Sequence, residues 1–199
     1  NASTSGKILY EGEELTDKKR SELLGRKIVF IPQSIDYLDP VMKVGKQVQG
    51  VYSTKERQEE LFEKYKLDKS VEDMYPFQLS GGMARRVLVS SALMEMPRLI
   101  VADEPTPGLS VDMAMDTLKH FREIADKGAG VLLITHDIDL ALHVADRIAV
   151  FYAGTIFEIA STKDFLEGRD ALRHPYSKEF ISALPQNEFK SIEGLQPYR

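Results

Sequence analysis

Two short stretches of the sequence carry residue types that can bind a phosphate and use a metal. Ser80 precedes Gly81 and Gly82 at the predicted start of a helix, and an apolar run ends in Asp103 and Glu104. Backbone N–H groups at a helix start form a cup for an anion, to which the serine adds a hydroxyl donor. Carboxylates at a strand end can hold Mg²⁺ and orient a water molecule. Together the two stretches predict half of a nucleotide-hydrolysing site.

Both stretches also have a structural explanation. Gly81 and Gly82 can simply begin a helix after a turn, and Asp103 and Glu104 can be surface carboxylates at a strand end. Phosphate binding is favoured because a double glycine costs conformational entropy. Metal binding is favoured because the strand before Asp103 is wholly apolar, and ligands bind at the carboxyl ends of such parallel strands.

The other half of such a site, a loop of the form G-x-x-x-x-G-K-[ST], is absent from the 199 residues. Gly6 and Lys7 resemble its end, but Ile8 stands where a hydroxyl is needed and Asn1 where the first glycine is needed. Residues 6–15 are therefore predicted to form a strand and a turn.

Composition limits the class of protein. At 43% hydrophobic residues the chain can form one or two compact units, and its net charge of -5 argues against nucleic-acid binding. The basic clusters at 18–20 and at Arg85 and Arg86 are predicted to be solvated helix faces. The sequence has no apolar run long enough to span a membrane, no secretory signal and no cysteine, which fits a cytosolic protein without disulfides or thiolate metal sites.

The elements that must position these residues alternate between strands and helices. Ser53 and Glu56 form a capping-box pattern that begins a helix, and Leu61, Phe62 and Tyr65 share one of its faces. The alternation predicts an α/β fold with a mostly parallel sheet covered on both faces by helices. The expected strands are 7–10, 26–31, 99–102, 130–135 and a hairpin of 147–152 with 155–159, and the expected helices are 16–24, 53–67, 80–94, 111–127, 137–145 and a short one capped by Ser161.

Several motifs in this order resemble the ATP-binding subunits of ABC transporters over almost the whole chain. Residues 79–83 look like the family signature, and 99–104 look like the Walker B strand. Gln33 looks like the Q-loop glutamine, 108–110 like the D-loop, and His136 like the switch histidine. The resemblance implies a P-loop NTPase-like fold with a helical subdomain insert, from which the N-terminal phosphate-loop portion is missing upstream of Asn1.

The resemblance also implies roles for the candidate residues, with ATP and Mg²⁺ as cofactors. Asp103 would hold Mg²⁺ and Glu104 would act as general base on the attacking water. His136 would contact the γ-phosphate and orient Glu104, and Gln33 would contact Mg²⁺ and water. Ser80, Gly81 and Gly82 would close over ATP held by a second ATPase subunit, so binding would require a dimer. His120, His143 and His174 are interpreted as structural.

The same resemblance implies a division of the chain into four parts. Residues 1–35 would be a partial ATPase core, 36–78 the helical subdomain, 79–160 the core with the signature, Walker B and switch histidine, and 161–199 a C-terminal extension. The last part resembles the extension of di- and oligopeptide or nickel importers, notably at 173–176, 180–185 and 192–197. Because no cysteine is present, no iron–sulfur cluster is expected there.

One residue departs from the family pattern. Ser110 stands where the D-loop commonly has aspartate, with Asp112 two residues later, so communication between the two subunits is expected to be weakened or rerouted, and an asymmetric pair of sites becomes more plausible.

The expected function is ATP hydrolysis that energises import of peptides or nickel through a membrane permease at the cytoplasmic face of the membrane, without nucleic acid. The 199 residues alone are expected not to bind ATP measurably. The alternatives are a non-transport ABC ATPase of DNA repair or translation, and a catalytically silent docking module.

Overall fold

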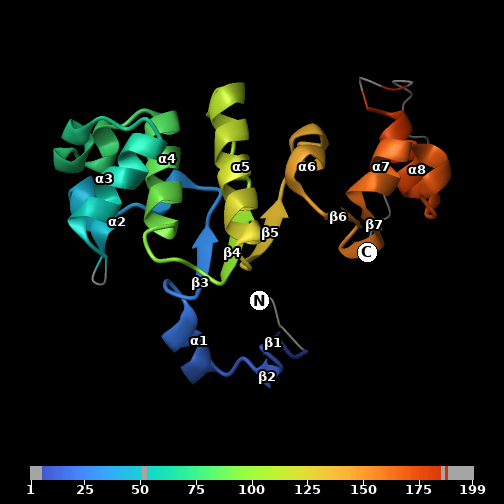
Figure 1. Cartoon of the computed structure of the whole chain (residues 1–199), viewed down its shortest axis with the longest axis horizontal. Coiled ribbons are helices and arrows are strands. Elements are labelled where there is room, and N and C mark those ends of the chain that lie inside the picture. Colours follow the sequence, from blue (N-terminus) through green and yellow to red (C-terminus); the bar gives the residue numbers. More distant parts are fainter. Residues whose placement is uncertain (1–5, 51–52, 185–186, 188–199) are drawn as a thin grey trace. The chain divides into compact units, whose positions relative to one another are not determined.

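The computed structural model describes residues 6–50, 53–184 and 187, which fall into two compact units. The first unit extends to His136 and contains the parallel sheet, and the second begins at Asp137 and contains an antiparallel hairpin. Figure 1 shows the elements of both. The four-part division expected from the sequence stays a prediction.

The first unit is built on three parallel strands in the order β3-β4-β5, which are Ile28–Ile31, Leu99–Asp103 and Gly130–Ile134. Their register pairs Ile31 with Ala102 and Asp103 with Ile134. All three strands therefore end at the same edge of the sheet, where Gln33, Glu104 and His136 follow within two residues of a strand end. The predicted parallel sheet is confirmed, and it sets these side chains at one edge.

Two helices contact this sheet (Figure 1): α4, Gly81–Ala92, meets β3, and α5, Val111–Asp126, meets β5. The strand residues on one face are buried or half-buried beneath neighbouring side chains, as Val29, Ile100 and Ala102 show. Ser80 and Ser110 cap the two helices, and their hydroxyls accept hydrogen bonds from backbone N–H groups three residues on. The two caps fix where the signature helix and the helix after the D-loop begin.

The opposite face of the sheet differs from the prediction that helices cover both faces. Phe30 is 48% exposed, Leu132 is 54% exposed and Ile134 is 47% exposed. These residues alternate with the buried ones, because successive side chains of a strand point to opposite faces. Among the described residues of the first unit, no helix shields these three apolar side chains from solvent. Within this unit, the described residues therefore cover one face of the sheet only.

A helical region lies between β3 and α4. It comprises η1 Ile35–Tyr37, α2 Val44–Gln49, α3 Lys55–Lys64, η2 Lys69–Asp73 and η3 Pro76–Gln78. Leu61, Phe62 and Tyr65 are buried as expected. Helix α3 begins one residue later than the capping pattern predicted, because Thr54 accepts from the Arg57 N–H while the Ser53 hydroxyl bonds Glu95.

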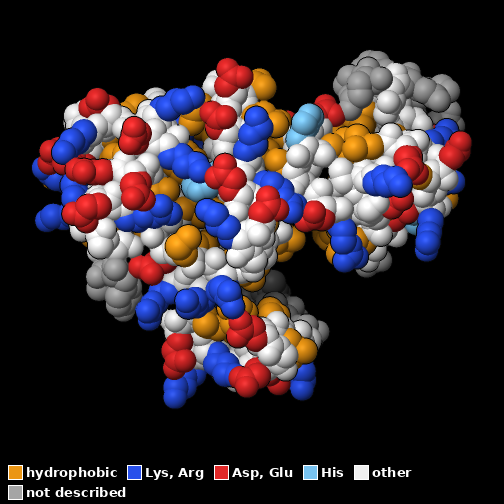
Figure 2. Space-filling view, viewed as in Figure 1, with side chains coloured by type: hydrophobic (Ala, Val, Ile, Leu, Met, Phe, Trp, Pro, Cys, Tyr) orange, Lys and Arg blue, Asp and Glu red, His pale blue; other side chains and the backbone are white. Residues whose placement is uncertain are grey.

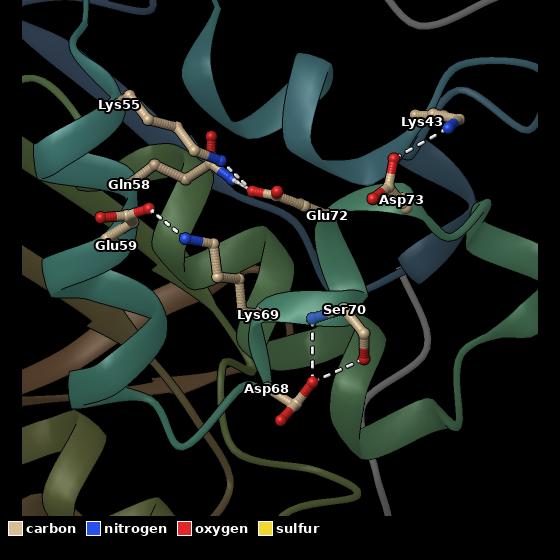
Figure 3. A network of polar contacts seen from close by, with 9 residues as sticks. All are labelled: Lys43, Lys55, Gln58, Glu59, Asp68, Lys69, Ser70, Glu72 and Asp73. Carbon is tan, nitrogen blue, oxygen red and sulfur yellow. Dashed lines mark hydrogen bonds and ion pairs between the residues drawn. The ribbon is translucent and has the colours of Figure 1, made fainter.

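Polar contacts join α2, α3 and η2 to one another (Figure 3). Glu72 accepts from Lys55 and from Gln58, Lys69 pairs with Glu59 at 3.0 Å, and Lys43 pairs with Asp73 at 2.8 Å. Close packing of α2 on η2 requires the small residue Gly45, since a Cβ there would lie 2.9 Å from the Glu72 Cβ and 3.1 Å from the Glu72 carbonyl oxygen. The helical region is therefore packed closely as well as charged. In Figure 2, acidic and basic side chains are interspersed over the face of α2 to α4 that the view shows.

The N-terminal part forms a small hairpin and a helix. Strands β1, Leu9–Tyr10, and β2, Glu13–Glu14, pair antiparallel around Glu11 and Gly12, which both have positive φ. Helix α1, Asp17–Leu23, follows and is capped by Thr16. The prediction of a strand and turn at 6–15, in place of a phosphate loop, is confirmed. Helix α1 buries none of its residues, so the basic cluster at 18–20 lies on a solvated helix as expected.

The second unit contains α6 Ile138–Val144, the hairpin β6 Arg147–Tyr152 and β7 Thr155–Ser161, α7 Thr162–Glu167, η4 Arg169–Ala171 and α8 Pro175–Ser182. Ala153 and Gly154 form the hairpin turn, both with positive φ as a tight two-residue turn requires. Val150, Phe165, Leu172 and Ile181 form its core. Ser161 caps α7 as predicted.

Candidate active site

Glu104 is held at the end of β4 by an unusual backbone conformation. Its φ is +45°, which is uncommon for a residue with a Cβ, and its N–H donates to the Ile134 carbonyl at 2.9 Å. The bond to β5 compensates for the strained conformation and prevents Glu104 from continuing the strand. Strain of this kind is concentrated at functional sites.

The side chain of Glu104 is closed into a network with the end of β5. Its Oε1 accepts from the His136 backbone N–H at 2.9 Å and from His136 Nδ1 at 2.7 Å, and its Oε2 accepts from the Thr135 hydroxyl at 3.3 Å. The carboxylate is only 14% exposed, whereas the imidazole is 82% exposed. The predicted meeting of Glu104 with His136 is confirmed. Glu104 is thus pre-oriented by its own chain, and the histidine faces solvent.

Which atom donates in the contact between His136 Nδ1 and Glu104 Oε1 depends on the tautomer of the ring. When Glu104 serves as a base it has no proton to donate, and Nδ1 is then the donor. A neutral ring then has an acceptor at Nε2, and only the charged imidazolium can donate from both nitrogens. Contact of His136 with a phosphate oxygen through Nε2 would therefore require the protonated ring.

Asp103 and Gln33 occupy the neighbouring positions at the same edge. Asp103 is the last residue of β4, and Gln33 is exposed two residues beyond the end of β3. In the part of the chain that the structure describes, no three His, Cys, Asp or Glu side chains are grouped to hold a metal ion by themselves. One carboxylate and one amide oxygen fit Mg²⁺, which keeps several waters and takes substrate phosphates as further ligands.

The two glycines of the signature have different surroundings. A Cβ built on Gly81 meets nothing within 4 Å, whereas a Cβ on Gly82 would lie 2.8 Å from the carbonyl oxygen of Gly108. Gly82 is therefore needed for packing within this chain, and Gly81 leaves an open backbone at an exposed helix start. The structural explanation holds for Gly82, while Gly81 and Ser80 are accessible to an incoming group.

The residue that contacts Gly82 belongs to the D-loop. Gly108 has φ +82°, a conformation that favours glycine, and its carbonyl packs against Gly82. Ser110, where the family has aspartate, accepts from the Met113 N–H and caps α5. The departure thus has a local structural role. Its expected effect on communication between subunits stays a prediction.

The prediction that Arg85 and Arg86 form a solvated helix face is wrong. Arg85 is 5% exposed and donates to the Pro32 carbonyl at 2.7 Å and also to the Gln33 carbonyl. Arg86 donates to the carbonyls of Tyr65 and Lys66 at 3.0 and 2.7 Å. Two basic residues in sequence suggested a surface, but both side chains donate to backbone carbonyls just after β3 and just after α3, which only the tertiary fold brings near α4.

The remaining histidines have structural partners, as predicted. His120 is buried beside Tyr65, whose hydroxyl lies 2.6 Å from Nδ1, and burial lowers the pKa of His120 to about 4. His143 donates from Nδ1 to the Asp139 carbonyl at 2.7 Å. His174 caps α8 and stacks on Phe157 with ring centroids 4.6 Å apart.

Part of the motif that resembles the importer extension belongs to the second unit. Glu158 on β7 accepts from the N–H groups of Arg173 and His174 at 2.8 and 3.0 Å and so fixes the start of α8. Residues 180–184 lie in α8 and just beyond it. The later motif at 192–197 lies outside the described residues.

Residues 1–107 match the family described as ABC transporter, which is more than half of the chain. The chain therefore belongs to the ABC transporter family. The parallel sheet, the signature helix and the acidic strand end described above are the features by which it was expected there.

Curated relatives are peptide-transport proteins. The chain is 34% identical over 200 residues to the oligopeptide transport ATP-binding protein OppD of Lactococcus lactis, which covers 92% of this chain and 58% of that protein. It is 33% identical over 201 residues to the dipeptide transport ATP-binding protein DppD of Haemophilus influenzae, covering 92% of this chain and 60% of that protein. The chain thus spans about three fifths of the length of these relatives.

A solved structure shares the fold. The dimeric ATP-binding cassette MJ0796, bound to ADP and Pi, matches with a TM-score of 0.71 at 25% identity, over 80% of this chain and 74% of that one. A second structure of this bacterial ABC transporter cassette, also dimeric, matches equally well. The α/β fold expected of a P-loop NTPase is thereby confirmed. No helix in the described ranges is long and apolar enough to cross a membrane.

Proposed function

We propose that this chain supplies the hydrolytic edge and the signature face of an ATPase subunit that drives peptide transport. The observation that carries the proposal is the Glu104 carboxylate, held by His136 and Thr135 at the edge where Asp103 and Gln33 also lie. Such a carboxylate can accept a proton from an attacking water, which is the task of a general base in phosphoryl transfer. Peptides are favoured over nickel because OppD and DppD are named for oligopeptide and dipeptide transport.

The residues have distinct tasks in this proposal. Asp103 and Gln33 would hold Mg²⁺, which would supply positive charge at the phosphates, and Glu104 would orient and deprotonate water. His136 restrains Glu104 and contacts the γ-phosphate as the imidazolium. Ser80, Gly81 and Gly82 present the signature helix start to ATP held by a second ATPase subunit, where Gly81 leaves the backbone open and Gly82 holds the helix against Gly108.

The phosphate loop of the complete site comes, in this proposal, from residues outside the 199. The exposed apolar side chains of Phe30, Leu132 and Ile134 support this, since they form the uncovered face of the very sheet whose edge carries Glu104. A segment that carried the loop and packed on this face would complete both the core and the site. The subunit would lie at the cytoplasmic face of the membrane and reach it through permease subunits.

The experiment measures ATP binding and hydrolysis with and without such a segment. Calorimetry of the 199-residue chain with ATP and Mg²⁺ is expected to show no binding at micromolar concentration. The polypeptide extended by its upstream coding sequence is expected to hydrolyse ATP, and Glu104→Gln is expected to lower the rate by about 10² to 10⁴-fold, the contribution typical of a positioned acid or base. Micromolar binding by the 199 residues would contradict the role of the loop.

Two other outcomes identify the alternatives. A wild-type rate equal to that of Glu104→Gln would identify a silent docking module. Hydrolysis that proceeds without a permease and responds to DNA or ribosomes would identify a non-transport ATPase. Uptake of labelled peptide and of nickel by cells that carry wild-type or Glu104→Gln protein then separates the two solutes.

A further inference from the structure

We propose that Arg85 is a positioning residue that ties the signature helix to the backbone of Gln33, so that the signature start and the γ-phosphate-sensing loop move as one body. The inference rests on the proposed function for what Gln33 does, but its geometry is independent of that function. Arg85 lies on α4 one turn after Gly82, and its two terminal nitrogens donate to the consecutive carbonyls of Pro32 and Gln33.

The guanidinium of Arg85 is buried without a carboxylate partner, which costs desolvation free energy. Arg85 is 5% exposed, and none of the ion pairs within 4.0 Å among the described residues includes it. Its Nε is buried and has no hydrogen-bond partner in the described part of the chain. Burying a guanidinium without a paired carboxylate is unfavourable. A small apolar side chain at this position of α4 would avoid that cost, so the fork of hydrogen bonds to the loop is the feature that explains an arginine here.

Among the described residues, the backbone between Gln33 and Leu38 has only local hydrogen bonds besides those to Arg85. Gln33 is exposed, the Asp36 N–H donates to the Ser34 hydroxyl and the Leu38 N–H donates to the Ile35 carbonyl. The next tertiary restraint is at Leu38, which is buried, and at Asp39, which the Gln47 side chain bonds at both its N–H and its carbonyl. Arg85 therefore links the segment after β3 to a distant element, 52 residues away in the sequence. The burial of Arg85 lowers its pKa, and the charge of Glu104 opposes that change, so the guanidinium also lies in the field of the proposed general base.

Arg86 is a matched control on the same helix. It is the same residue type, donates to backbone carbonyls of Tyr65 and Lys66, and has its pKa lowered by burial in the same way. It anchors the end of α3 and makes no contact with Pro32 or Gln33. Arg85→Met removes two carbonyl contacts and Arg86→Met removes three, the third being the contact of Arg86 Nε with the Gly82 carbonyl at 3.2 Å within α4. Both variants keep the aliphatic stem and each removes two contacts with another element, so the comparison is made on the location of those two contacts.

The first test is hydrogen–deuterium exchange on the 199-residue chain, read at the Asp36 and Leu38 amides. Arg85→Met is expected to speed exchange there by about tenfold, with Arg86→Met unchanged at these amides and faster instead near residue 67. Arg85→Lys, which keeps a charge and a donor, is expected to be intermediate. Equal exchange at Asp36 and Leu38 in the two methionine variants overturns the proposal, and if Arg85→Met fails to fold, wild-type exchange in Arg85→Lys overturns it.

The second test asks whether Arg85 acts through Gln33, in the ATP-hydrolysing polypeptide. Arg85→Met is expected to lower kcat more than it raises KM, Arg85→Lys to recover part of kcat, and Arg85→Met with Gln33→Ala to match Gln33→Ala alone, because residues that act as a unit are not additive. Additive losses would overturn action through Gln33. A wild-type protein without ATPase activity would defeat the proposed function, whereas the exchange result would still decide whether Arg85 positions the loop.

Discussion

The acidic edge of the sheet and the start of the signature helix are two parts of one proposed machine, but they differ in how complete they are. Glu104 is closed into hydrogen bonds with Thr135 and His136 of its own chain and is only 14% exposed. Ser80 and Gly81 are exposed, and nothing lies within 4 Å of a Cβ built on Gly81. The edge is preassembled, whereas the helix start is open toward solvent.

This difference separates two ways in which a residue can be required. A residue of the edge acts through contacts that the folded chain already makes, so its substitution changes local geometry even without a ligand. A residue of the helix start that only meets another molecule is expected to be silent until that molecule binds. Gly82 lies between these cases, because it belongs to the helix start but packs on Gly108.

The largest effect is expected from a variant that disrupts the preassembled edge. His136→Ala removes the ring donor to Glu104 and the proposed phosphate contact, and we expect a loss of about 10² to 10³-fold in ATP hydrolysis by the extended polypeptide. Because the ring is 82% exposed, thermal stability is expected to change little. His143→Ala removes another exposed histidine with a single Nδ1 contact and serves as the control. Equal rates for the two variants would contradict a role for His136.

A second effect separates the two glycines of the signature by stability. Gly82→Ala places a methyl group against the Gly108 carbonyl, and we expect it to destabilise the 199-residue chain by about 1–3 kcal/mol. Gly81→Ala has open space and is expected to change stability by less than about 1 kcal/mol, because alanine favours a helix. Urea unfolding of both variants measures the difference. Equal stabilities would mean that the helix start shifts freely and that the contact with Gly108 is not a restraint.

The same pair sharpens the functional comparison. Gly81→Ala, although stable, is expected to weaken ATP-driven association of two extended chains in gel filtration, since a methyl group narrows the space for an incoming phosphate. An unchanged dimer in Gly81→Ala would show that the open backbone is not a ligand site.

A third effect concerns the buried contact between His120 on α5 and Tyr65 at the end of α3. Burial lowers the pKa of His120 to about 4, below its ordinary value of 6.5, so the folded chain binds fewer protons than the unfolded chain between these pH values. Stability is therefore expected to fall as the pH drops from 6.5 toward 4, by roughly 2 kcal/mol between pH 7 and pH 5. Urea unfolding at pH 7 and pH 5 measures this, and His120→Gln, which cannot titrate, is expected to flatten the dependence. The same slope in both proteins would assign the acid sensitivity to other groups.

Much of this arrangement was predictable from the sequence, because it depends on local signals. The helix caps at Ser80, Ser110 and Ser161, the apolar run of β4 and the two-residue turn at Ala153 and Gly154 all follow from residue types at fixed spacing. The meeting of Glu104 with His136 was also predictable, since neighbouring parallel strands end at one edge.

The rest depends on contacts between residues far apart in the chain. A pair of arginines in a helix gives no local sign of whether carbonyls await it, so the burial of Arg85 was missed. The division of labour between Gly81 and Gly82 was equally hidden, because it is decided by Gly108 on another loop. The apolar run of β4 predicted burial on both faces, yet shielding of the second face requires an element that the described residues of the first unit do not supply.

The smallest expected effect tests the comparison most directly, because two serines have the same structural task. Ser80 and Ser110 each accept a hydrogen bond from the N–H three residues on, at 3.2 and 3.4 Å, and each caps one helix that packs on the sheet. Loss of such a cap costs about 1 kcal/mol, so Ser80→Ala and Ser110→Ala are expected to destabilise the 199-residue chain by similar amounts in urea. Ser80→Ala is expected also to weaken ATP-driven association of the extended chains, whereas Ser161→Ala, which removes the cap of α7 outside both the signature and the D-loop, is not. If Ser80→Ala and Ser161→Ala weaken association equally, capping alone explains Ser80, and its exposed helix start is not a site for a partner's nucleotide.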